Sequence, residues 1–580
     1  IASGGNYNVA VGDEAGTALT TGDNNVAVGF AALQSEDGNG NNVAIGYGAL
    51  NTLNAGAEAY NVAVGRSAGT AVTTGIYNVL VGGLAGDAMT DADQNVGVGQ
   101  GALGANTVGS HSTALGTFAL AAQNPATAAD MYNTAVGSSA GAAVTTGVRN
   151  TLIGGLSGDA LTLGYYNTAV GYGTLSADTK GNHNVVMGHN ALTAQNFTTA
   201  TDSYNTAIGS NAGAAVTTGT LNTLIGGLAG DALTSGNNNT AVGYLALSAD
   251  TLGDRNTALG TSALTAQNFT TTTDSYNTAV GFTAGASITI GNNNDLFGGL
   301  TGDALTEGAY NIAVGRSALS ADTKGSYAVA VGHATLAAQN FTTATSSYNT
   351  AVGYSAGNDI TTGIKNTLIG SLAGDALTDA DENTAIGYQS LSLDTMGSKT
   401  TALGKGALAN QNFTTATDSY NVAVGHHAGV AVTTGVENTL IGAFAGDALD
   451  VGNTNTAVGS QALGTDTKGD RNVAIGRHAL STQNFTTSTD SYNTAVGYDA
   501  GTAVTTGQSN TLIGGLAGDA ITTGSENTAV GYRALSTEDG NGLNTAIGVD
   551  SLMTQNAGAN AYNTAVGYHS GKLLTTGIRN

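Results

Sequence analysis

Short apolar phrases, each closed by a glycine, recur along the whole chain. In the phrase at residues 205–209, the side chains of Thr206 and Ile208 fall on one face of an extended chain and Ala207 falls on the other. The phrases are separated by Asn, Asp, Ser and Thr, which favour turns. Runs of four or five β-prone residues ended by Gly are typical of strands and too short for helices. A second apolar phrase in each coil, such as residues 246–253, predicts a further short side.

The spacing of the closing glycines is regular enough to predict the fold. Most steps follow the order 17, 17, 17 and 21 residues, so that four coils make a unit of 72 residues, and this unit repeats six times between Gly65 and Gly497. A single coil is too small to bury a stable core, whereas stacked coils share hydrogen bonds and a continuous apolar row. The sequence therefore predicts an all-β parallel β-solenoid, one continuous repeat domain over residues 1–580.

Three columns of the stack follow from this register. The residue four positions before the closing glycine is Asn in 29 of 32 coils, the exceptions being Ser112, Ala328 and Thr400. Stacked Asn amides can bond along the axis, which predicts a structural ladder. The predicted ladder includes Asn205, Asn222, Asn239, Asn256 and Asn277. The glycine itself suits a corner with positive φ or a close backbone approach. The Ala two positions before it is expected opposite the core, where a small residue would let another chain lie close.

Composition excludes several classes of function. The chain has no Cys, so disulfides, thiolate metal sites and cysteine nucleophiles are impossible. The net charge of −25 with only 15 Lys and Arg would repel a phosphate backbone, so no nucleic-acid partner is expected. No apolar run of about 18 residues is present, so membrane insertion by this stretch is not expected either. Both ends lie in repeat phase, which suggests a segment of a longer chain.

The four-residue insertion in every fourth coil is the candidate contact site. Residues 195–204 contain it, and its copies begin at Gln267, Gln339, Gln411 and Gln483. Two hypotheses fit the aromatic residue of each copy: an exposed ring that contacts a glycan or a protein, or a ring that tucks back and seals the coil. The five rings concerned belong to Phe197, Phe269, Phe341, Phe413 and Phe485.

Other polar columns point to turns more than to chemistry. Asp231 and its equivalents every 72 residues follow a Gly-rich phrase similar to a calcium-binding nonapeptide, but no adjacent coil offers the second half of a calcium site. A second Asp column includes Asp178 and Asp250 and is also expected in turns. The eight histidines occupy no single column, and no nucleophile, phosphate-loop or acid–base arrangement is evident. No enzyme activity, metal or cofactor is predicted.

The repeated phrases carry a resemblance to a known group of proteins. Residues 239–260, with two Asn-Thr-Ala-aliphatic-Gly phrases around an Ala-Leu phrase, resemble the head repeats of YadA-like trimeric autotransporter adhesins and the related repeats of bacteriophage tail fibres. The resemblance covers essentially the whole chain, and it implies a left-handed parallel β-roll, three chains wound side by side, and display outside a cell or on a virion. Coils of 17 residues are longer than is usual in the adhesin heads, which favours the phage-fibre branch.

The leading hypothesis from the sequence is therefore a non-enzymatic extracellular fibre shaft, homotrimeric, that spaces or presents a tip binding a host or surface. Its partners would be other copies of the chain and a cell-surface glycan or protein receptor. The alternative is a self-polymerising surface filament or sheath, because open strand edges invite end-to-end joining. Ice binding by the Thr-Thr-Gly phrases, such as residues 217–219, is a third hypothesis, although these phrases recur only every fourth coil.

Overall fold

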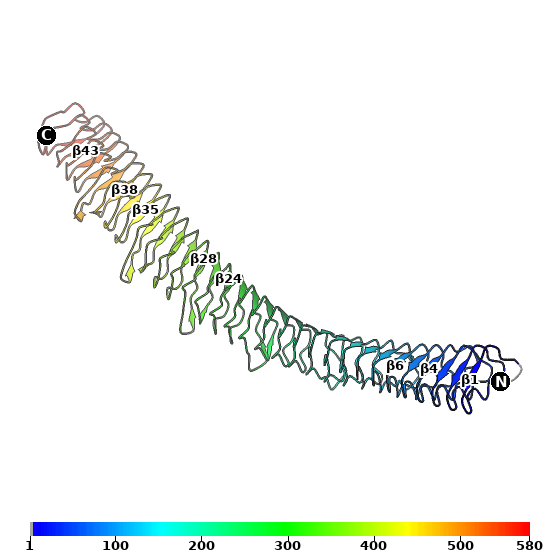
Figure 1. The fold of residues 1–580 in the computed structure, drawn as a ribbon. Helices are drawn as coiled ribbons and strands as arrows, with labels where there is room; N and C mark the ends of the chain where they lie inside the picture. The colour runs from blue at the N-terminus through cyan, green and yellow to red at the C-terminus, as the bar shows by residue number, and fades with distance from the viewer. Residues whose placement is uncertain (1–3) are drawn as a thin grey trace. The chain divides into compact units, whose positions relative to one another are not determined.

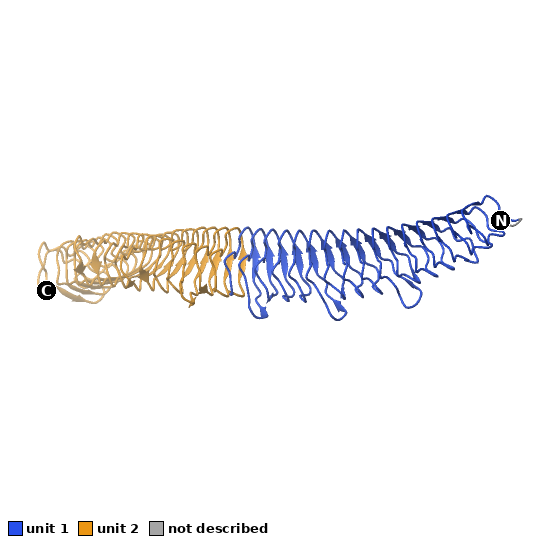
Figure 2. Cartoon of the chain, turned by 60° about the horizontal axis from the view of Figure 1, so that its bottom comes forward, with its two compact units in different colours: residues 1–290 blue, residues 291–580 orange. Residues whose placement is uncertain are grey.

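The computed structural model describes residues 4–580 and divides the chain into two compact units, Ile1–Ile290 and Gly291–Asn580, called unit 1 and unit 2 (Figure 2). No helix occurs in residues 4–580. Each coil contributes one three-residue strand, and the strands of successive coils lie side by side within each unit (Figure 1). Their pairing is parallel and in register, for example Thr206 with Thr223 and Thr223 with Thr240. The predicted all-β parallel β-solenoid is confirmed.

The strands of this main face in unit 1 are β1 (Val9–Val11), β2 (Val26–Val28), β3 (Val43–Ile45), β4 (Val62–Val64), β5 (Val79–Val81), β6 (Val96–Val98), β8 (Thr113–Leu115), β10 (Thr134–Val136), β11 (Thr151–Ile153), β12 (Thr168–Val170), β14 (Val185–Met187), β16 (Thr206–Ile208), β17 (Thr223–Ile225), β18 (Thr240–Val242), β20 (Thr257–Leu259) and β22 (Thr278–Val280). Two-residue strands pair beside the longer coils: β7 (Gly109–Ser110) with β9 (Ala129–Asp130), β13 (Gly181–Asn182) with β15 (Thr201–Asp202), and β19 (Gly253–Asp254) with β21 (Thr273–Asp274).

Unit 2 repeats this arrangement. Its main-face strands are β23 (Asp295–Phe297), β24 (Ile312–Val314), β26 (Val329–Val331), β28 (Thr350–Val352), β29 (Thr367–Ile369), β30 (Thr384–Ile386), β32 (Thr401–Leu403), β34 (Val422–Val424), β35 (Thr439–Ile441), β36 (Thr456–Val458), β38 (Val473–Ile475), β40 (Thr494–Val496), β41 (Thr511–Ile513), β42 (Thr528–Val530), β43 (Thr545–Ile547) and β44 (Thr564–Val566). The short pairs are β25 (Gly325–Ser326) with β27 (Thr345–Ser346), β31 (Gly397–Ser398) with β33 (Thr417–Asp418), and β37 (Gly469–Asp470) with β39 (Thr489–Asp490).

The rest of each coil consists of tight corners rather than a second long strand. In the coil that follows β18, Leu245, Leu247 and Arg255 have φ values of 57°, 54° and 61°. Left-handed residues this close together bend the chain too sharply for extended structure. The corners are nevertheless bonded along the axis, since the Leu247 N–H donates to the carbonyl of Ala263 at 2.9 Å. Each coil is thus hydrogen-bonded to the next on more than its strand side.

The closing glycine is required for two reasons at once. Gly209 has a φ of 139°, a conformation that residues with a side chain rarely adopt. A Cβ added to it would lie 2.4 Å from the carbonyl oxygen of Gly226 in the next coil and 2.5 Å from its carbonyl carbon. Both sequence-based reasons for this glycine, positive φ and close backbone approach, therefore hold.

The Ala column lies inside the solenoid, so the expectation that it faces away from the core was wrong. Ala207, Ala241 and Ala258 are fully buried, whereas the flanking Thr206 and Ile208 are half-buried and point outward. The alternation along the strand was predicted correctly, but the inward face was assigned to the wrong set of side chains. The core of each coil is therefore narrow.

Volume compensation inside this narrow core explains the four-coil period. Where the strand carries the large Leu224 in place of Ala, the corner glycines Gly213 and Gly230 leave room for it: a Cβ on either would lie within 2.8 Å of a Leu224 methyl. Where the strand carries Ala241, the equivalent corner position is the buried Leu247. Large and small residues alternate between facing positions because the interior is close-packed.

Candidate functional site

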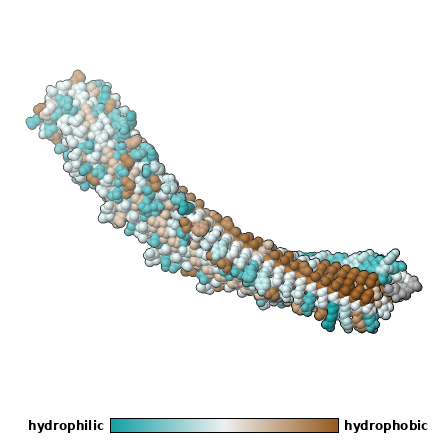
Figure 3. All heavy atoms as spheres, in the orientation of Figure 1, coloured by the Kyte–Doolittle hydropathy of each residue, from teal (hydrophilic) through white to brown (hydrophobic). Residues whose placement is uncertain are grey.

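The outward strand face is an aliphatic surface at the N-terminal end of unit 1. In β1 to β6 the first and third residues are Val, apart from Ile45, and Val9 and Val11 are 48% and 58% exposed. The space-filling view shows an apolar band over this part of the chain (Figure 3). From β8 onward most strands begin with Thr. Contiguous exposed apolar surface is typical of interaction sites, and we call this strip the valine face.

The Asn ladder lies directly behind the outward face. The backbone N–H of Asn222 donates to the side-chain Oδ1 of Asn205 at 2.9 Å, and that of Asn239 donates to Oδ1 of Asn222 at 3.0 Å. Each Nδ2 turns across the coil; that of Asn239 donates to the carbonyl of Gly253 at 2.9 Å. Direct amide–amide bonds also occur, as between Asn256 and Asn239 at 3.1 Å. These buried amides hold one coil to the next and tie both sides of the coil together.

At two of the exceptions in the Asn ladder, the hydrogen bond to the preceding coil is formed but the side chain does not continue the ladder to the next coil. The N–H groups of Ala328 and Thr400 still donate to Asn311 and Asn383, both at 2.9 Å. Ala328 has no side-chain oxygen to continue the column, and the Thr400 hydroxyl is hydrogen-bonded to the Ser419 hydroxyl instead. The stack tolerates these gaps because strand pairing continues through β26 and β32.

The inserted loops are anchored by a buried carboxylate. Asp178 accepts hydrogen bonds from Nε2 of Gln195 at 2.7 Å and from the N–H of Phe197 at 3.2 Å. Oε1 of the same Gln195 accepts from Nδ2 of Asn205, so the loop is joined to the Asn ladder. Burial raises the pKa of Asp178, and these hydrogen bonds oppose that rise. The same network recurs around Asp250, with Gln267 and Asn277.

The aromatic rings of the loops point inward. The five candidate rings are only 5% to 6% exposed, which fits the sealing hypothesis and not the exposed-ring hypothesis: Phe197, Phe269, Phe341, Phe413 and Phe485. The phenyl group closes the end of the coil beside the buried Asp and Gln. Contact with a partner at these loops would therefore have to come from other exposed residues of the insertion, such as Thr198, Asp202 and Tyr204.

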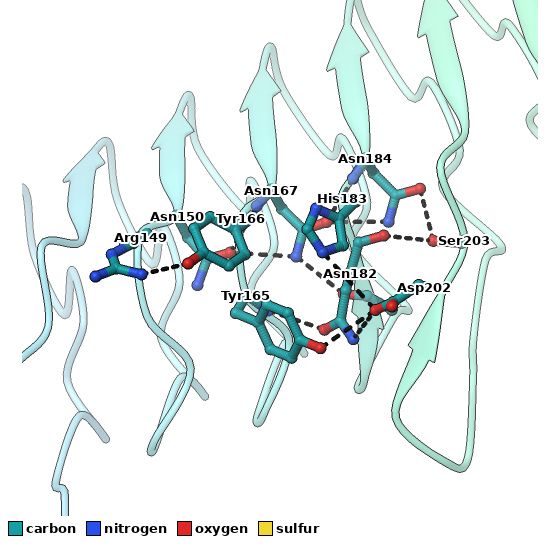
Figure 4. A network of polar contacts seen from close by, with 11 residues as sticks. Arg149, Asn150, Tyr165, Tyr166, Asn167, Asn182, His183, Asn184, Asp202 and Ser203 are labelled. Carbon is teal, nitrogen blue, oxygen red and sulfur yellow. Dashed lines mark hydrogen bonds and ion pairs between the residues drawn. The ribbon is translucent and has the colours of Figure 1, made fainter.

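A column of stacked rings and cations, which the sequence did not reveal, borders the Asn ladder. The rings of Tyr166 and His183 stack with centroids 5.1 Å apart, and His183 stacks on Tyr204 at 4.8 Å. Arg149 extends the column, with its guanidinium 5.3 Å from the Tyr166 ring (Figure 4). Asp202 lies beside it and accepts from the Tyr165 hydroxyl at 3.2 Å. The column arises because the residue before each ladder Asn points outward at the axial spacing of one coil.

This column recurs where a longer coil follows. Arg255 lies over Tyr276 and pairs with Asp274, and Arg471 lies over Tyr492 and pairs with Asp490. The signal in the sequence was a basic or aromatic residue 21 positions before each of these tyrosines. Exposed cation–π pairs contribute about 0.5–1 kcal/mol each. A ring such as that of His183, covered on both faces, offers no free face on which a ligand could stack.

The Asp column near the Gly-rich phrase has seven members, and in five of them one buried carboxylate oxygen lacks a hydrogen-bond partner. In Asp159, Asp231, Asp303, Asp375 and Asp519 the Oδ1 atom is buried without a hydrogen-bond partner. Burial raises the pKa of these carboxyls, that of Asp375 to about 6. No cluster of three or more His, Asp or Glu that could hold a metal ion occurs among residues 4–580. The histidines lie in several columns, with His426 and His427 in mutual contact.

Comparison with family models and with curated proteins finds no match to this chain. Nor does the described part of the chain contain a helix long and apolar enough to cross a membrane.

Proposed function

We propose that this chain builds the shaft of a non-enzymatic extracellular fibre, on a virion or a cell surface, that holds a host- or surface-binding tip away from its base. The observation that carries the proposal is the continuous axial hydrogen bonding within each unit, through strands, corners and the Asn ladder. Stacks of this kind resist bending because every coil is bonded to its neighbours at several points. The uniform repeat supplies length without a specialised centre.

We further propose that the shaft is a homotrimer, as the resemblance to adhesin heads and tail fibres implies. The valine face supports this part of the proposal, because an aliphatic strip of six consecutive strands is costly to leave in water. The net charge of −25 keeps such fibres apart from one another in solution.

Shaft length gives a direct test. Deleting residues 210–281 removes one 72-residue unit and rejoins the chain in phase, because Gly209 and Gly281 are equivalent. Electron microscopy of the deletion variant should show particles shorter by about 19 Å, four coils at about 4.8 Å each. Unchanged length, or a collapse of the parallel β structure in both units, would refute a modular shaft.

Mass in solution tests the trimer. Light scattering should give three chain masses, and Val79→Glu, which places a charge in the valine face, should shift the particle to a single chain mass. The control Ala57→Glu changes an exposed residue in a loop outside that face and should leave the mass unchanged. A monomeric wild-type chain would refute the trimer, and growth of particles without limit as concentration rises would favour the filament hypothesis.

A further inference from the structure

One pocket in unit 2 departs from the regular surface of the repeat. Its volume is about 350 Å³, and three successive coils line it. Asp447 comes from the coil that follows β35, Gln461 and Gly464 from the coil that follows β36, and His478 and Thr482 from the coil that follows β38. The volume is at the lower end of the range for small-molecule sites, roughly 300–1,000 Å³.

Comparison with the other 72-residue copies shows which residue opens this pocket. Asp447 has an equivalent Asp in every 72-residue copy, but the residue equivalent to Gly464 is serine in five of them: Ser176, Ser248, Ser320, Ser392 and Ser536. Those five coils lie against the five aspartates whose Oδ1 is buried without a partner. A Cβ on Gly464 would lie 3.4 Å from Oδ1 of Asp447. Glycine at this position therefore uncovers the carboxylate that serine covers elsewhere.

Other lining residues also differ from their equivalents. Thr482 stands where four other copies have alanine, at Ala122, Ala194, Ala266 and Ala338. The copy that contains Asp87 is the one other copy with glycine, Gly104, beside its Asp. In that copy the residue equivalent to His478 is Phe118. Only the copy at Asp447 thus combines an uncovered carboxylate with an imidazole, an amide and hydroxyl groups.

The lining is rich in hydrogen-bond acceptors. The Thr465 hydroxyl donates its hydrogen to the carbonyl of Ser481 at 2.9 Å, and the Thr482 hydroxyl donates to the carbonyl of Thr502 at 2.5 Å, so both oxygens offer lone pairs. His478 is held in place by Asp499 at 3.2 Å and by Oε1 of Gln461 at 2.6 Å. Burial raises the pKa of Asp447, opposed by nearby His427. A ligand for this surface must bring several donors and no negative charge.

We propose that this pocket binds one pyranose unit of a neutral glycan. Two vicinal sugar hydroxyls would donate to the Asp447 carboxylate, and others would donate to the Thr465 and Thr482 oxygens. A neutral sugar fits better than a small cation, because the hydrogen-bond acceptors of the lining are distributed over a volume far larger than one ammonium group. The hydroxyl groups around a sugar ring are distributed over a comparable volume. The site goes beyond the shaft function and gives the fibre a lateral sugar contact once in each chain.

The experiment uses the 580-residue chain with methyl glycosides of the common neutral hexoses, followed by saturation-transfer NMR and calorimetry, with n-butylamine as a cationic probe. At least one hexoside should bind saturably. Gly464→Ser, which installs the residue of five other copies, should weaken that binding at least tenfold, and Asp447→Asn, which keeps the shape, should do the same. The matched control Gly104→Ser should leave it unchanged.

Circular dichroism and the urea midpoint verify that each variant keeps the wild-type fold. Absence of saturable hexoside binding, binding unaffected by both pocket variants, or binding of n-butylamine in place of the sugars would each overturn the proposal. These outcomes are independent of fibre length and chain mass, so failure of the sugar site and failure of the shaft proposal are distinguishable.

Discussion

Replacement of a closing glycine by alanine tests the stacking argument most directly. At Gly209 the new Cβ would meet the Gly226 carbonyl at 2.4 Å and the Gly227 nitrogen at 3.0 Å. All the atoms it meets are backbone atoms of the next coil, so the clash cannot be relieved by turning a side chain. Left-handed strain contributes roughly 1–3 kcal/mol and overpacking a further 1–3 kcal/mol, which predicts a cost of about 2–6 kcal/mol for Gly209→Ala.

The chain contains a matched control for the two contributions. Gly567 belongs to the same column and has a φ of 125°, but a Cβ added there meets nothing within 4 Å. Gly567→Ala should therefore carry the backbone strain alone, roughly 1–3 kcal/mol.

Hydrogen exchange is the appropriate assay, because long repeats unfold locally and a single unfolding midpoint is not well defined for them. In Gly209→Ala the amides of Gly226 and Leu228, which bond back to the mutated coil, should exchange about 30-fold faster or more. The amide of Gly442 in unit 2 should be unaffected. Unchanged exchange at Gly226, or an equal loss of protection around Gly567 in its own variant, would refute the role assigned to axial contact.

Three further predictions follow from the buried groups. Asn239→Ala removes a ladder rung and should cost about 1–3 kcal/mol by hydrogen exchange, whereas Thr261→Ala, at an exposed residue outside the ladder and outside the left-handed corners, should cost under about 0.5 kcal/mol; equal costs would contradict the ladder. Phe269→Ala should cost about 3–5 kcal/mol and expose its loop to limited proteolysis, while Phe282→Ala, at a ring 60% exposed, should leave proteolysis unchanged. Burial raises the pKa of Asp375 from 3.8 to about 6, so its stabilising contribution is full below pH 3.8 and is lost as the pH rises through about 6. Asp375→Asn should therefore flatten the stability profile between about pH 4 and 6, and a profile identical to wild type would show that this carboxyl titrates normally.

The sequence by itself determined the strand side of each coil. Because each residue stacks on its equivalent in the next coil, most often 17 positions along, a single repeated phrase such as residues 205–209 predicts parallel pairing, the Asn column and the need for glycine. These features depend on local conformation and on translation by one coil, and both can be read from one repeat.

The tertiary structure decided which side of the strand faces the core. Alternation divides Thr206 and Ile208 from Ala207, but the direction in which the coil closes depends on left-handed corners such as Leu245, whose conformation no residue preference announces. The inward turn of Phe269, the stacking of His183 between two tyrosines and the pocket at Asp447 likewise depend on side chains from different coils. Contacts of this kind are set by the closure of the whole coil and the space left inside it, quantities that a linear pattern of polar and apolar residues does not contain.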